Sequence, residues 1–293
     1  MTTNAHMYHG DAGEFTFRRC PQCGLVSLNP PVPPEELGEF YQDYYLPYRG
    51  AAAWGRFQAL AERGMARTDA LRVRRAASRL PAQGAVLDVG CGQPTFLRDL
   101  LRRMPHISAR GIDFVDTGWR EDESSWEGIE LVVADPAVYE YAEPVDLITM
   151  WHYLEHDYHP VETLQRMRTL AHGETRLLIE VPHVNGLSRW WYGRYWEGWH
   201  APRHTALYSR ATLTETLRRG GWRVVRYSTR GTLDTFALWW MSAMERRRID
   251  WRGSLARHFP AFILFRVLSA PLFMLEGLLP LGVQIVEAVP ETT

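Results

Sequence analysis

Short runs of aliphatic residues alternate with longer stretches at helical spacing through the middle of the chain, between residues 84 and 232. The short runs are typical of buried strands, and apolar residues that repeat every three or four positions indicate amphipathic helices. We therefore expect helices after residue 92, over about 160–171 and over 210–219, and strands over 85–89, 109–113, 130–134, 145–150, 176–181 and 222–227. Alternating strands and helices form right-handed βαβ units, so the pattern predicts a mostly parallel sheet with helices on both faces.

The sequence on either side of this core, which we place at 81–232, predicts further parts. Residues 1–48 hold a Cys-x-x-Cys pair and a proline-rich turn, which indicate a small N-terminal arm, and residues 49–80 predict a helical lead-in. Residues 233–281 are too apolar for disorder, so we expect a helical insertion. Within 282–293, a last strand at 283–289 should pair antiparallel with 222–227 and complete a seven-stranded sheet.

The composition excludes several classes of protein. The chain has 293 residues, of which 46% are hydrophobic and 23% charged, which is typical of globular proteins. Its formal net charge of −1 gives no basic field, which argues against nucleic acid as a partner. Every basic side chain is an arginine, so no lysine can form a Schiff base or act as a base.

The cysteine content and the apolar segments indicate the compartment. Three cysteines and a polar N-terminus exclude a disulfide framework and a secretory signal, so we expect the protein to be cytoplasmic. The most apolar stretch, 260–282, contains Arg266 and Glu276, and its uncharged runs are too short to span a membrane. Peripheral contact with a membrane through this stretch stays open.

Glycines and carboxylates follow three consecutive expected strands. Asp88-Val-Gly-Cys-Gly92 ends the first strand, and its glycines let backbone N–H groups approach a ligand at a helix N-terminus. Asp113 ends the second strand, where a carboxylate can accept hydrogen bonds from both hydroxyls of a ribose. Asp135 follows the third strand, where an acceptor can meet an adenine amino group. Because ligands bind beyond the carboxyl ends of such strands, the set predicts a nucleoside site rather than three unrelated turns.

These segments resemble a known superfamily. Val86-Leu-Asp-Val-Gly-Cys-Gly92, with Phe96 and Leu97, resembles motif I of class I S-adenosylmethionine-dependent methyltransferases, and Val145-Asp-Leu-Ile-Thr-Met-Trp-His-Tyr-Leu-Glu-His156 resembles their motif IV. Glu180-Val-Pro-His183, Trp199-His-Ala-Pro-Arg-His204 and Tyr208-Ser209 resemble a bacterial subgroup of small-molecule methyltransferases. The resemblance implies an α/β, Rossmann-like fold and S-adenosylmethionine as cofactor. One departure is Pro94, which replaces the third glycine of motif I and suits the first turn of a helix.

The strand ends and the resemblance together predict the cofactor-binding residues. They are Asp88, Gly90, Cys91, Gly92, Phe96, Asp113, Phe114, Asp135, Pro136, Met150 and Trp151.

Histidines supply the candidates for acid–base chemistry. His152, Glu155 and His156 follow the fourth strand, and their spacing places them on one face if the segment is helical. A histidine there could remove a proton from an acceptor hydroxyl or amine, because imidazole titrates near neutral pH. The same residues resemble a divalent-metal arrangement of ubiquinone-pathway O-methyltransferases, and they could equally brace the loop. His183 and His204 are rival candidates for the base.

Two further groups leave a functional and a structural interpretation open. Six aromatic residues between Trp190 and Trp199 are suited to an acceptor lid or to anchoring a long loop. Cys20 and Cys23 resemble the zinc-ribbon start of some sugar C-methyltransferases; because zinc needs four ligands, His6 and His9 are the candidates to complete it. An unmetallated turn is the alternative.

We therefore expect an enzyme that methylates a small molecule with an apolar or aromatic part, such as a natural product, a sugar or a lipid-like intermediate. The apolar insertion at 233–281 should close the acceptor pocket, or else form a dimer interface or a membrane contact. O-, N- and C-methylation stay open, as do a monomer and a homodimer. The alternatives are a non-catalytic cofactor-binding module and a dinucleotide-dependent oxidoreductase, although Thr95 breaks the Gly-x-Gly-x-x-Gly spacing that the latter needs.

Overall fold

The computed structural model describes residues 2–4, 14–41, 49–141 and 143–291. The chain forms two compact units. The large-sheet unit consists of Arg67–Val181, Arg210–Ser228 and Ile285–Thr293, and the small-sheet unit consists of Met1–Ala66, Pro182–Ser209 and Thr229–Gln284. Each is described by itself.

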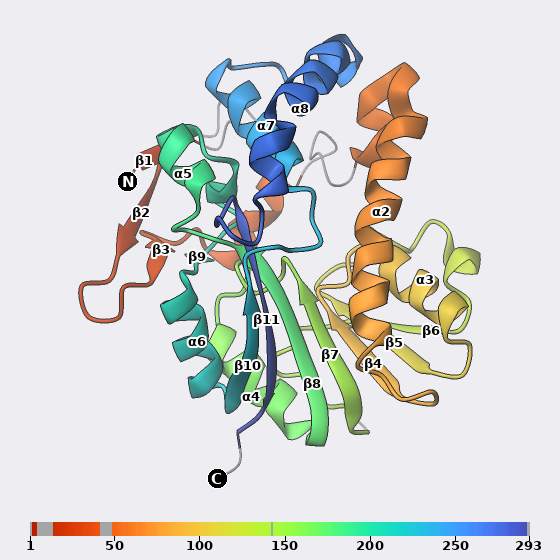
Figure 1. The fold of residues 1–293 in the computed structure, drawn as a ribbon. Coiled ribbons are helices and arrows are strands. Elements are labelled where there is room, and N and C mark those ends of the chain that lie inside the picture. The colour runs from red at the N-terminus through yellow and green to blue at the C-terminus, as the bar shows by residue number, and fades with distance from the viewer. Residues whose placement is uncertain (1, 5–13, 42–48, 142, 292–293) are drawn as a thin grey trace. The chain divides into compact units, whose positions relative to one another are not determined.

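The large-sheet unit is built on a seven-stranded sheet (Figure 1). Its spatial order is β10 (Trp222–Ser228), β11 (Val283–Pro290), β8 (Ala171–Pro182), β7 (Val145–Trp151), β4 (Ala85–Val89), β5 (Ser108–Asp113) and β6 (Ile129–Val133). The strands from β8 to β6 are parallel, and β10 pairs antiparallel with β11. The predicted α/β fold and the antiparallel pairing of the last strand are thereby confirmed. The strand order reverses between β4 and β7, which is where ligands bind in sheets of this kind.

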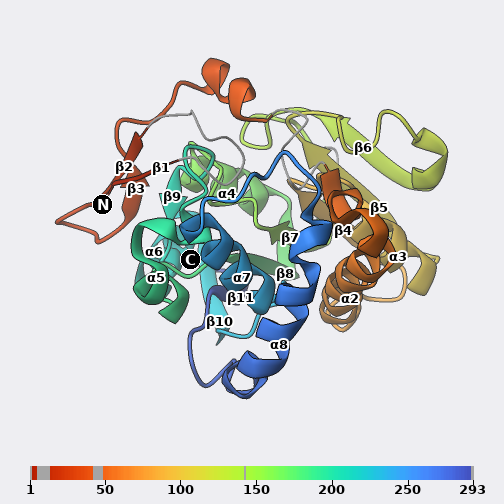
Figure 2. The same cartoon turned by 90° about the horizontal axis from the view of Figure 1, so that it is seen from above.

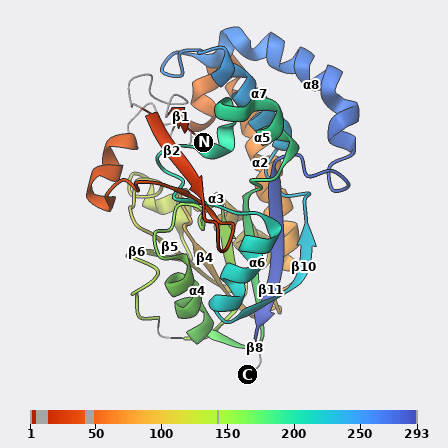
Figure 3. The ribbon, with the colours of Figure 1, turned by 90° about the vertical axis from the view of Figure 1, so that its left-hand side faces the viewer.

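Helices cover both faces of this sheet, because each has one apolar side. Figures 1 and 3 show α4 (Pro160–Thr169) and α6 (Arg210–Arg219) on one face, with α3 (Thr95–Arg103) and the C-terminal part of α2 (Gln58–Ala77) on the other. In α3, Phe96, Leu97 and Leu100 are buried while the arginines lie outside. A 3-10 turn, η3 (Glu123–Trp126), precedes β6. The apolar side of α3 is therefore buried, as its periodicity predicts.

The small-sheet unit holds a four-stranded sheet that the sequence pattern did not predict. Its order is β1 (Thr2–Asn4), β2 (Glu14–Arg19), β3 (Val26–Leu28) and β9 (Ala206–Leu207), all in antiparallel pairs. Its helices are α5 (Leu187–Tyr192), α7 (Thr235–Arg246) and α8 (Phe259–Met274), seen from above in Figure 2. Short 3-10 helices connect them: η1 (Pro34–Phe40), η2 (Gly50–Phe57), η4 (Gly193–Tyr195), η5 (Glu197–Trp199) and η6 (Leu255–His258). Helices α7 and α8 lie within residues 233–281, where the sequence predicts a helical insertion.

Aromatic residues form the cores of the small-sheet unit. Trp199 packs against Phe17 at 4.9 Å between ring centroids, and Trp240 packs against Phe262 at 5.3 Å. The aromatic run therefore divides into two groups. Tyr192, Trp196 and Trp199 are buried, whereas Trp190 and Trp191 are 78% and 69% exposed. Tyr195 is partly buried, so Trp190 and Trp191 are the members of the run that offer most of their side chain to a ligand or a partner. Within the described residues, no helix is long and apolar enough to cross a membrane.

Candidate cofactor and acceptor site

The turn after β4 is held against β5 and borders an open space at Gly92. Gly90 and Gly92 have φ angles of 71° and 51°, a region that favours glycine. The N–H groups of Gly90 and Cys91 donate to the Ile112 carbonyl at 2.8 and 3.2 Å, which ties the turn to β5. A Cβ on Gly90 would lie 2.3 Å from the Tyr153 ring, whereas a Cβ on Gly92 would meet no atom within 4 Å. Gly90 is therefore required by packing, and Gly92 borders a space that a ligand can fill.

Asp113, at the end of β5, reaches back to this turn. Its Oδ2 accepts a hydrogen bond from the Gly92 N–H at 2.8 Å, and its Oδ1 accepts one from the Phe114 N–H at 2.7 Å. Burial raises the pKa of Asp113, while these N–H groups act in the opposite direction. Each carboxylate oxygen can accept a second hydrogen bond, so the pair can still receive two ligand hydroxyls. The side chain thus fixes the turn and offers the acceptors that a ribose needs.

The other two strand-end carboxylates have different surroundings. Asp88 is 3% exposed, and its Oδ1 accepts a hydrogen bond from Thr149 Oγ1 at 2.5 Å. Burial raises the pKa of Asp88 to about 7. Asp135 is exposed, and its Oδ1 accepts a hydrogen bond from the Ala137 N–H at 2.8 Å. Asp88 is consequently a buried residue that links β4 to β7 beneath the glycine turn. Asp135 uses Oδ1 for the hydrogen bond to Ala137, and its Oδ2 can accept one from a ligand.

The apolar residues predicted to contact the cofactor are mostly interior. Phe96 packs edge-on against Trp151 at 5.5 Å, and Met150 is completely buried. Phe114 is 50% exposed and stacks on the Tyr153 ring at 6.3 Å. Of these rings, Phe114 has the accessible face for a flat ligand.

Two further predicted residues complete this group. Pro136 and Cys91 are buried, and burial raises the pKa of the Cys91 thiol. Neither side chain offers a charged group to a ligand. Pro94 immediately precedes α3, in keeping with its place at the helix start.

His152 lies directly after β7, between two buried carboxylates. Its Nδ1 is 3.1 Å from Glu155 Oε1, and its Nε2 is 3.1 Å from Glu180 Oε1. Both glutamate side chains have no exposed surface, and the imidazole is 19% exposed. The backbone of His152 is left-handed at φ 57°, held by its N–H donating to the Glu180 carbonyl at 2.9 Å. We call Glu155, His152 and Glu180 the carboxylate–imidazole triad.

The triad determines the charge state of this histidine. Burial alone would lower the pKa of His152, but the hydrogen bonds and charges of Glu155 and Glu180 outweigh it and raise the pKa to about 9. At neutral pH His152 is an imidazolium that donates from both ring nitrogens. It has no lone pair with which to take a proton, so the geometry disfavours His152 as the base. Glu180 was missed by the sequence argument, although a charged residue inside an apolar strand was a signal.

The remaining histidine of this segment, His156, is still a candidate for the base. Its backbone N–H donates to the Tyr153 carbonyl at 2.9 Å, so the segment after β7 forms a tight turn. The turn fixes the backbone of His156 within the large-sheet unit.

Two rival bases lie in the small-sheet unit, and their hydrogen bonds distinguish them. His183 Nδ1 accepts from the Asn185 N–H at 3.0 Å, which places the proton of the neutral ring on Nε2. His204 Nδ1 lies 2.9 Å from the Gly198 carbonyl, to which it can only donate, so the acceptor of the neutral ring is Nε2. His204 also stacks on His200 at 4.8 Å, a neighbour that the sequence argument missed despite its spacing of four residues. The tautomer of His204 is that of a general base.

The Cys-x-x-Cys segment forms the expected tight turn between β2 and β3. The Gly24 N–H donates to the Cys20 carbonyl at 2.9 Å, and Gly24 has a φ of 78°. N–H groups of Cys23 and Gln22 lower the pKa of the Cys20 thiol, which favours the thiolate that binds metals. The other predicted zinc ligands, His6 and His9, lie outside the described residues.

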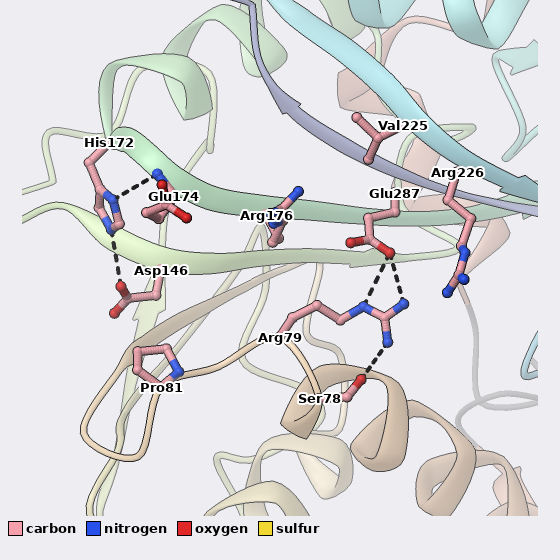
Figure 4. A pocket seen from close by; sticks show the side chains of 10 residues that line it. All are labelled: Ser78, Arg79, Pro81, Asp146, His172, Glu174, Arg176, Val225, Arg226 and Glu287. Carbon is pink, nitrogen blue, oxygen red and sulfur yellow. Dashed lines mark hydrogen bonds and ion pairs between the residues drawn. The ribbon is translucent and has the colours of Figure 1, made fainter.

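A separate hollow of about 900 Å³ lies near the amino-terminal ends of β7 and β8 (Figure 4). Several charged side chains that line it pair with one another: Arg79 forms an ion pair with Glu287 at 2.8 Å, and His172 lies 3.0 Å from Asp146. Because ligands of such sheets bind at the carboxyl ends of the strands, we do not assign the chemistry to this hollow.

Comparison with known proteins agrees with this geometry. The profile of a family described as a methyltransferase domain matches residues 61–227. No curated protein sequence matches the chain.

Solved structures show the same fold. The 4+2 cyclase SpnF superposes with a TM-score of 0.57 at 17% identity over 90% of this chain and 98% of its own. A chain in the complex of the Haloferax volcanii Trm112 methyltransferase activator with a methyltransferase gives 0.54 at 17% identity, covering 84% and 98%. The mycolic acid cyclopropane synthase CmaA1, solved with S-adenosylhomocysteine and CTAB, gives 0.52 at 14% identity, covering 75% and 83%. At these identities the likeness shows the fold alone, and the different names illustrate that one fold supports several reactions.

Proposed function

The chain belongs to the methyltransferase domain family and is an S-adenosylmethionine-dependent methyltransferase, and on that premise we propose that its acceptor is a small molecule with an apolar or aromatic part. We place the cofactor site where the Gly92 N–H donates a hydrogen bond to Asp113. There an open turn and a two-oxygen acceptor meet at the reversal of the strand order. Nucleosides bind at this place in doubly wound sheets.

The residues present fit S-adenosylmethionine. Gly92 leaves room for the cofactor beside the turn, and Asp113 can accept hydrogen bonds from the two ribose hydroxyls. Asp135 can accept a hydrogen bond from the adenine amino group, and Phe114 offers an exposed face to the adenine ring. When bound, the cofactor supplies an electrophilic methyl group on a sulfonium. The protein holds the acceptor in line, excludes water and removes a proton where the acceptor carries one.

We assign the base to His204 in preference to His152 and His183. His152 is an imidazolium between two carboxylates, and neutral His183 carries its proton on Nε2. Of these three rings, His204 is the one with Nδ1 committed as a donor, so that its Nε2 is the acceptor in the neutral ring, and His156 stays the other candidate. His204→Asn should lower kcat by a factor of about 10²–10⁴ and abolish the low-pH limb of the rate profile, as expected for a lost general base. His183→Asn is the matched control, and an unchanged profile in His204→Asn refutes the assignment.

The acceptor class rests on the exposed aromatic residues and the apolar insertion. Trp190 and Trp191 expose most of their surface although large aromatic side chains favour burial, which suits a role in holding a planar or lipid-like molecule. We also propose that the α7–α8 insertion covers the bound acceptor. Turnover measured as S-adenosylhomocysteine release across phenols, apolar amines, glycosides and fatty-acyl compounds tests this class. Activity only on small polar amines would refute it.

Zinc at the Cys20–Cys23 turn remains a proposal. Two thiols within one tight turn, one of them with a lowered pKa, supply half of a tetrahedral site. His6 and His9 would supply the rest. Such a zinc would be structural, because its four positions are filled by protein ligands.

A thermal-shift screen separates this function from its alternatives. S-adenosylmethionine and S-adenosylhomocysteine should both raise the Tm, and NAD should not, since only a ligand of the folded state stabilises it. A shift with NAD alone would indicate an oxidoreductase. Binding of both methyl-transfer ligands without turnover of any acceptor would instead indicate a non-catalytic cofactor-binding module.

A further inference from the structure

One face of α8 consists of exposed apolar residues. Its most exposed members are Leu264, Val267, Leu268 and Met274, which are between 61% and 82% exposed, and Leu278, just beyond the end of the helix, is 83% exposed. From Phe259 to Leu278, all within the described residues, Arg266 is the charged residue with a substantially exposed side chain, at 41%, and it is paired with Asp234. Val267 and Leu268 follow Leu264 by three and four residues, and Met274 follows Val267 by two helical turns, so these side chains form a stripe along the helix. We call this stripe the α8 face.

The opposite side of α8 is fully used by packing inside the small-sheet unit. Phe262, Phe265 and Phe273 each contact the Phe236 ring, at 5.1, 5.4 and 5.5 Å between centroids. Arg266, the one charged residue within the helix, pairs with Asp234 at 2.6 Å. The orientation of α8 is therefore fixed by its own unit, and the exposure of the α8 face does not come from a loosely held helix.

A basic segment leads into the α8 face. From the last residue of α7 to the start of α8 there are five arginines, all exposed, and a single exposed acidic residue, Asp250. The arginines are Arg246, Arg247, Arg248, Arg252 and Arg257. The excess of positive charge in this segment is notable because the whole chain has a net charge of −1. We call it the basic segment.

We propose that the α8 face and the basic segment dock the protein on an anionic lipid bilayer. Helices that lie in a membrane interface combine an apolar face, which enters the acyl boundary, with basic residues, which meet anionic headgroups. An apolar surface alone would suit a protein partner equally. The adjoining positive charge favours a negatively charged surface, and a second copy of the chain would bring the same positive segment against itself. The docking is peripheral, and it is independent of the methyl-transfer assignment.

Vesicle flotation of the full-length protein tests the proposal. The protein should float with vesicles of phosphatidylcholine and phosphatidylglycerol at a 7:3 ratio, and much less with phosphatidylcholine alone. Leu264→Glu/Leu268→Glu places two carboxylates on the α8 face and should reduce the bound fraction at least tenfold. Arg247→Gln/Arg257→Gln leaves the face intact and should weaken binding about fivefold for each arginine removed. Val138→Glu, at a 72% exposed position of the large-sheet unit, is the matched control and should float like the wild type.

The outcomes decide between the occupants of the face. Loss of flotation in both double variants with retention in Val138→Glu supports the membrane. Equal flotation with neutral and anionic vesicles, or wild-type flotation of Leu264→Glu/Leu268→Glu, overturns it. If that variant converts a dimer to a monomer in sedimentation while flotation is unchanged, the face is an interface between copies. If it only raises an acceptor KM, the face belongs to the acceptor site. Unaltered circular dichroism of the variants confirms that each is folded.

Discussion

Replacement of His152 by asparagine removes the positive charge at the centre of the carboxylate–imidazole triad. Asparagine is the appropriate substitute because it tolerates the left-handed backbone, here at φ 57°, better than other polar residues. The variant leaves Glu155 and Glu180 in place, buried and without the cation between them. We expect it to be less stable than the wild type, and we expect the difference between the two proteins to depend on pH.

The magnitude follows from the pKa of the imidazole. In the folded protein it is about 9, against 6.5 for an unperturbed histidine, and this difference corresponds to about 3 kcal/mol of stability. Because the folded pKa is the higher one, the contribution is present in full below pH 6.5. It is lost as the pH rises from 6.5 through 9, where the folded protein also gives up the proton. The wild type should therefore lose this stability over that interval, and the variant should not.

Urea unfolding of both proteins at intervals from pH 6 to pH 9.5 measures the effect. The raised pKa of Asp88 also makes stability pH-dependent, but it does so equally in both proteins and cancels from the difference. An NMR titration of the His152 ring in the folded wild type gives the pKa directly. A difference in unfolding free energy that stays constant across the range, or a ring that titrates near 6.5, would refute the charged triad.

Three other outcomes follow from the same contacts. Asp113→Ala should weaken S-adenosylhomocysteine binding by about 1–3 kcal/mol in calorimetry, since two loop hydrogen bonds and the ribose acceptors are lost together; unchanged affinity would move the cofactor elsewhere. Trp240→Ala should cost about 3–5 kcal/mol in unfolding free energy because the side chain is 1% exposed, whereas Trp190→Ala, at 78% exposed, should change stability by less than about 0.5 kcal/mol and raise the acceptor KM. Metal analysis of protein purified without a His tag should find one zinc per chain, and none after Cys20→Ser; a zinc-free wild type contradicts the proposed site.

The large sheet could be predicted from sequence because its signals are local. The central parallel strands β4 and β7 are almost completely buried, so they appear as aliphatic runs, and the helices that cover the sheet display a buried side every three or four residues. Leu87 and Val89 in β4, and Leu97 and Leu100 in α3, have no exposed surface. The glycine turn and the strand-end carboxylates were equally readable, because their residue types are demanded by backbone geometry at one point of the chain.

The β3–β9 edge of the small sheet could not be predicted because it depends on distant pairing. Strands β3 and β9 are only three and two residues long, and they come from segments almost two hundred residues apart. Nothing in either segment specifies the other.

The burial of the residues in the aromatic run could not be predicted for a related reason. Trp191 and Trp199 have the same residue type, and only the surrounding tertiary structure decides that Trp191 is exposed and Trp199 is buried.

Histidine roles were the least predictable part of the candidate site, since they depend on what each ring nitrogen contacts. The motif that contains His152 suggested a base, but its two glutamate neighbours, one of them on β8, hold it as a cation. His204 lay in a segment that gave no preference among candidates, and a single backbone carbonyl assigns its proton to Nδ1. Two chemically identical side chains are thus given different hydrogen-bond partners by their environments, and such differences are how proteins divide acid–base roles.

This division separates two pH effects that would otherwise be confused. A base works only when deprotonated, so the low-pH limb of the rate profile reports the acceptor nitrogen of His204 under our assignment. The triad contributes stability only while His152 is protonated, so loss of structure at high pH reports that residue. Substitution of His204 should alter the first without the second, and substitution of His152 should alter stability while it leaves the low-pH limb in place. The two histidines can therefore be assigned independently, because neither experiment relies on the identity of the methyl acceptor.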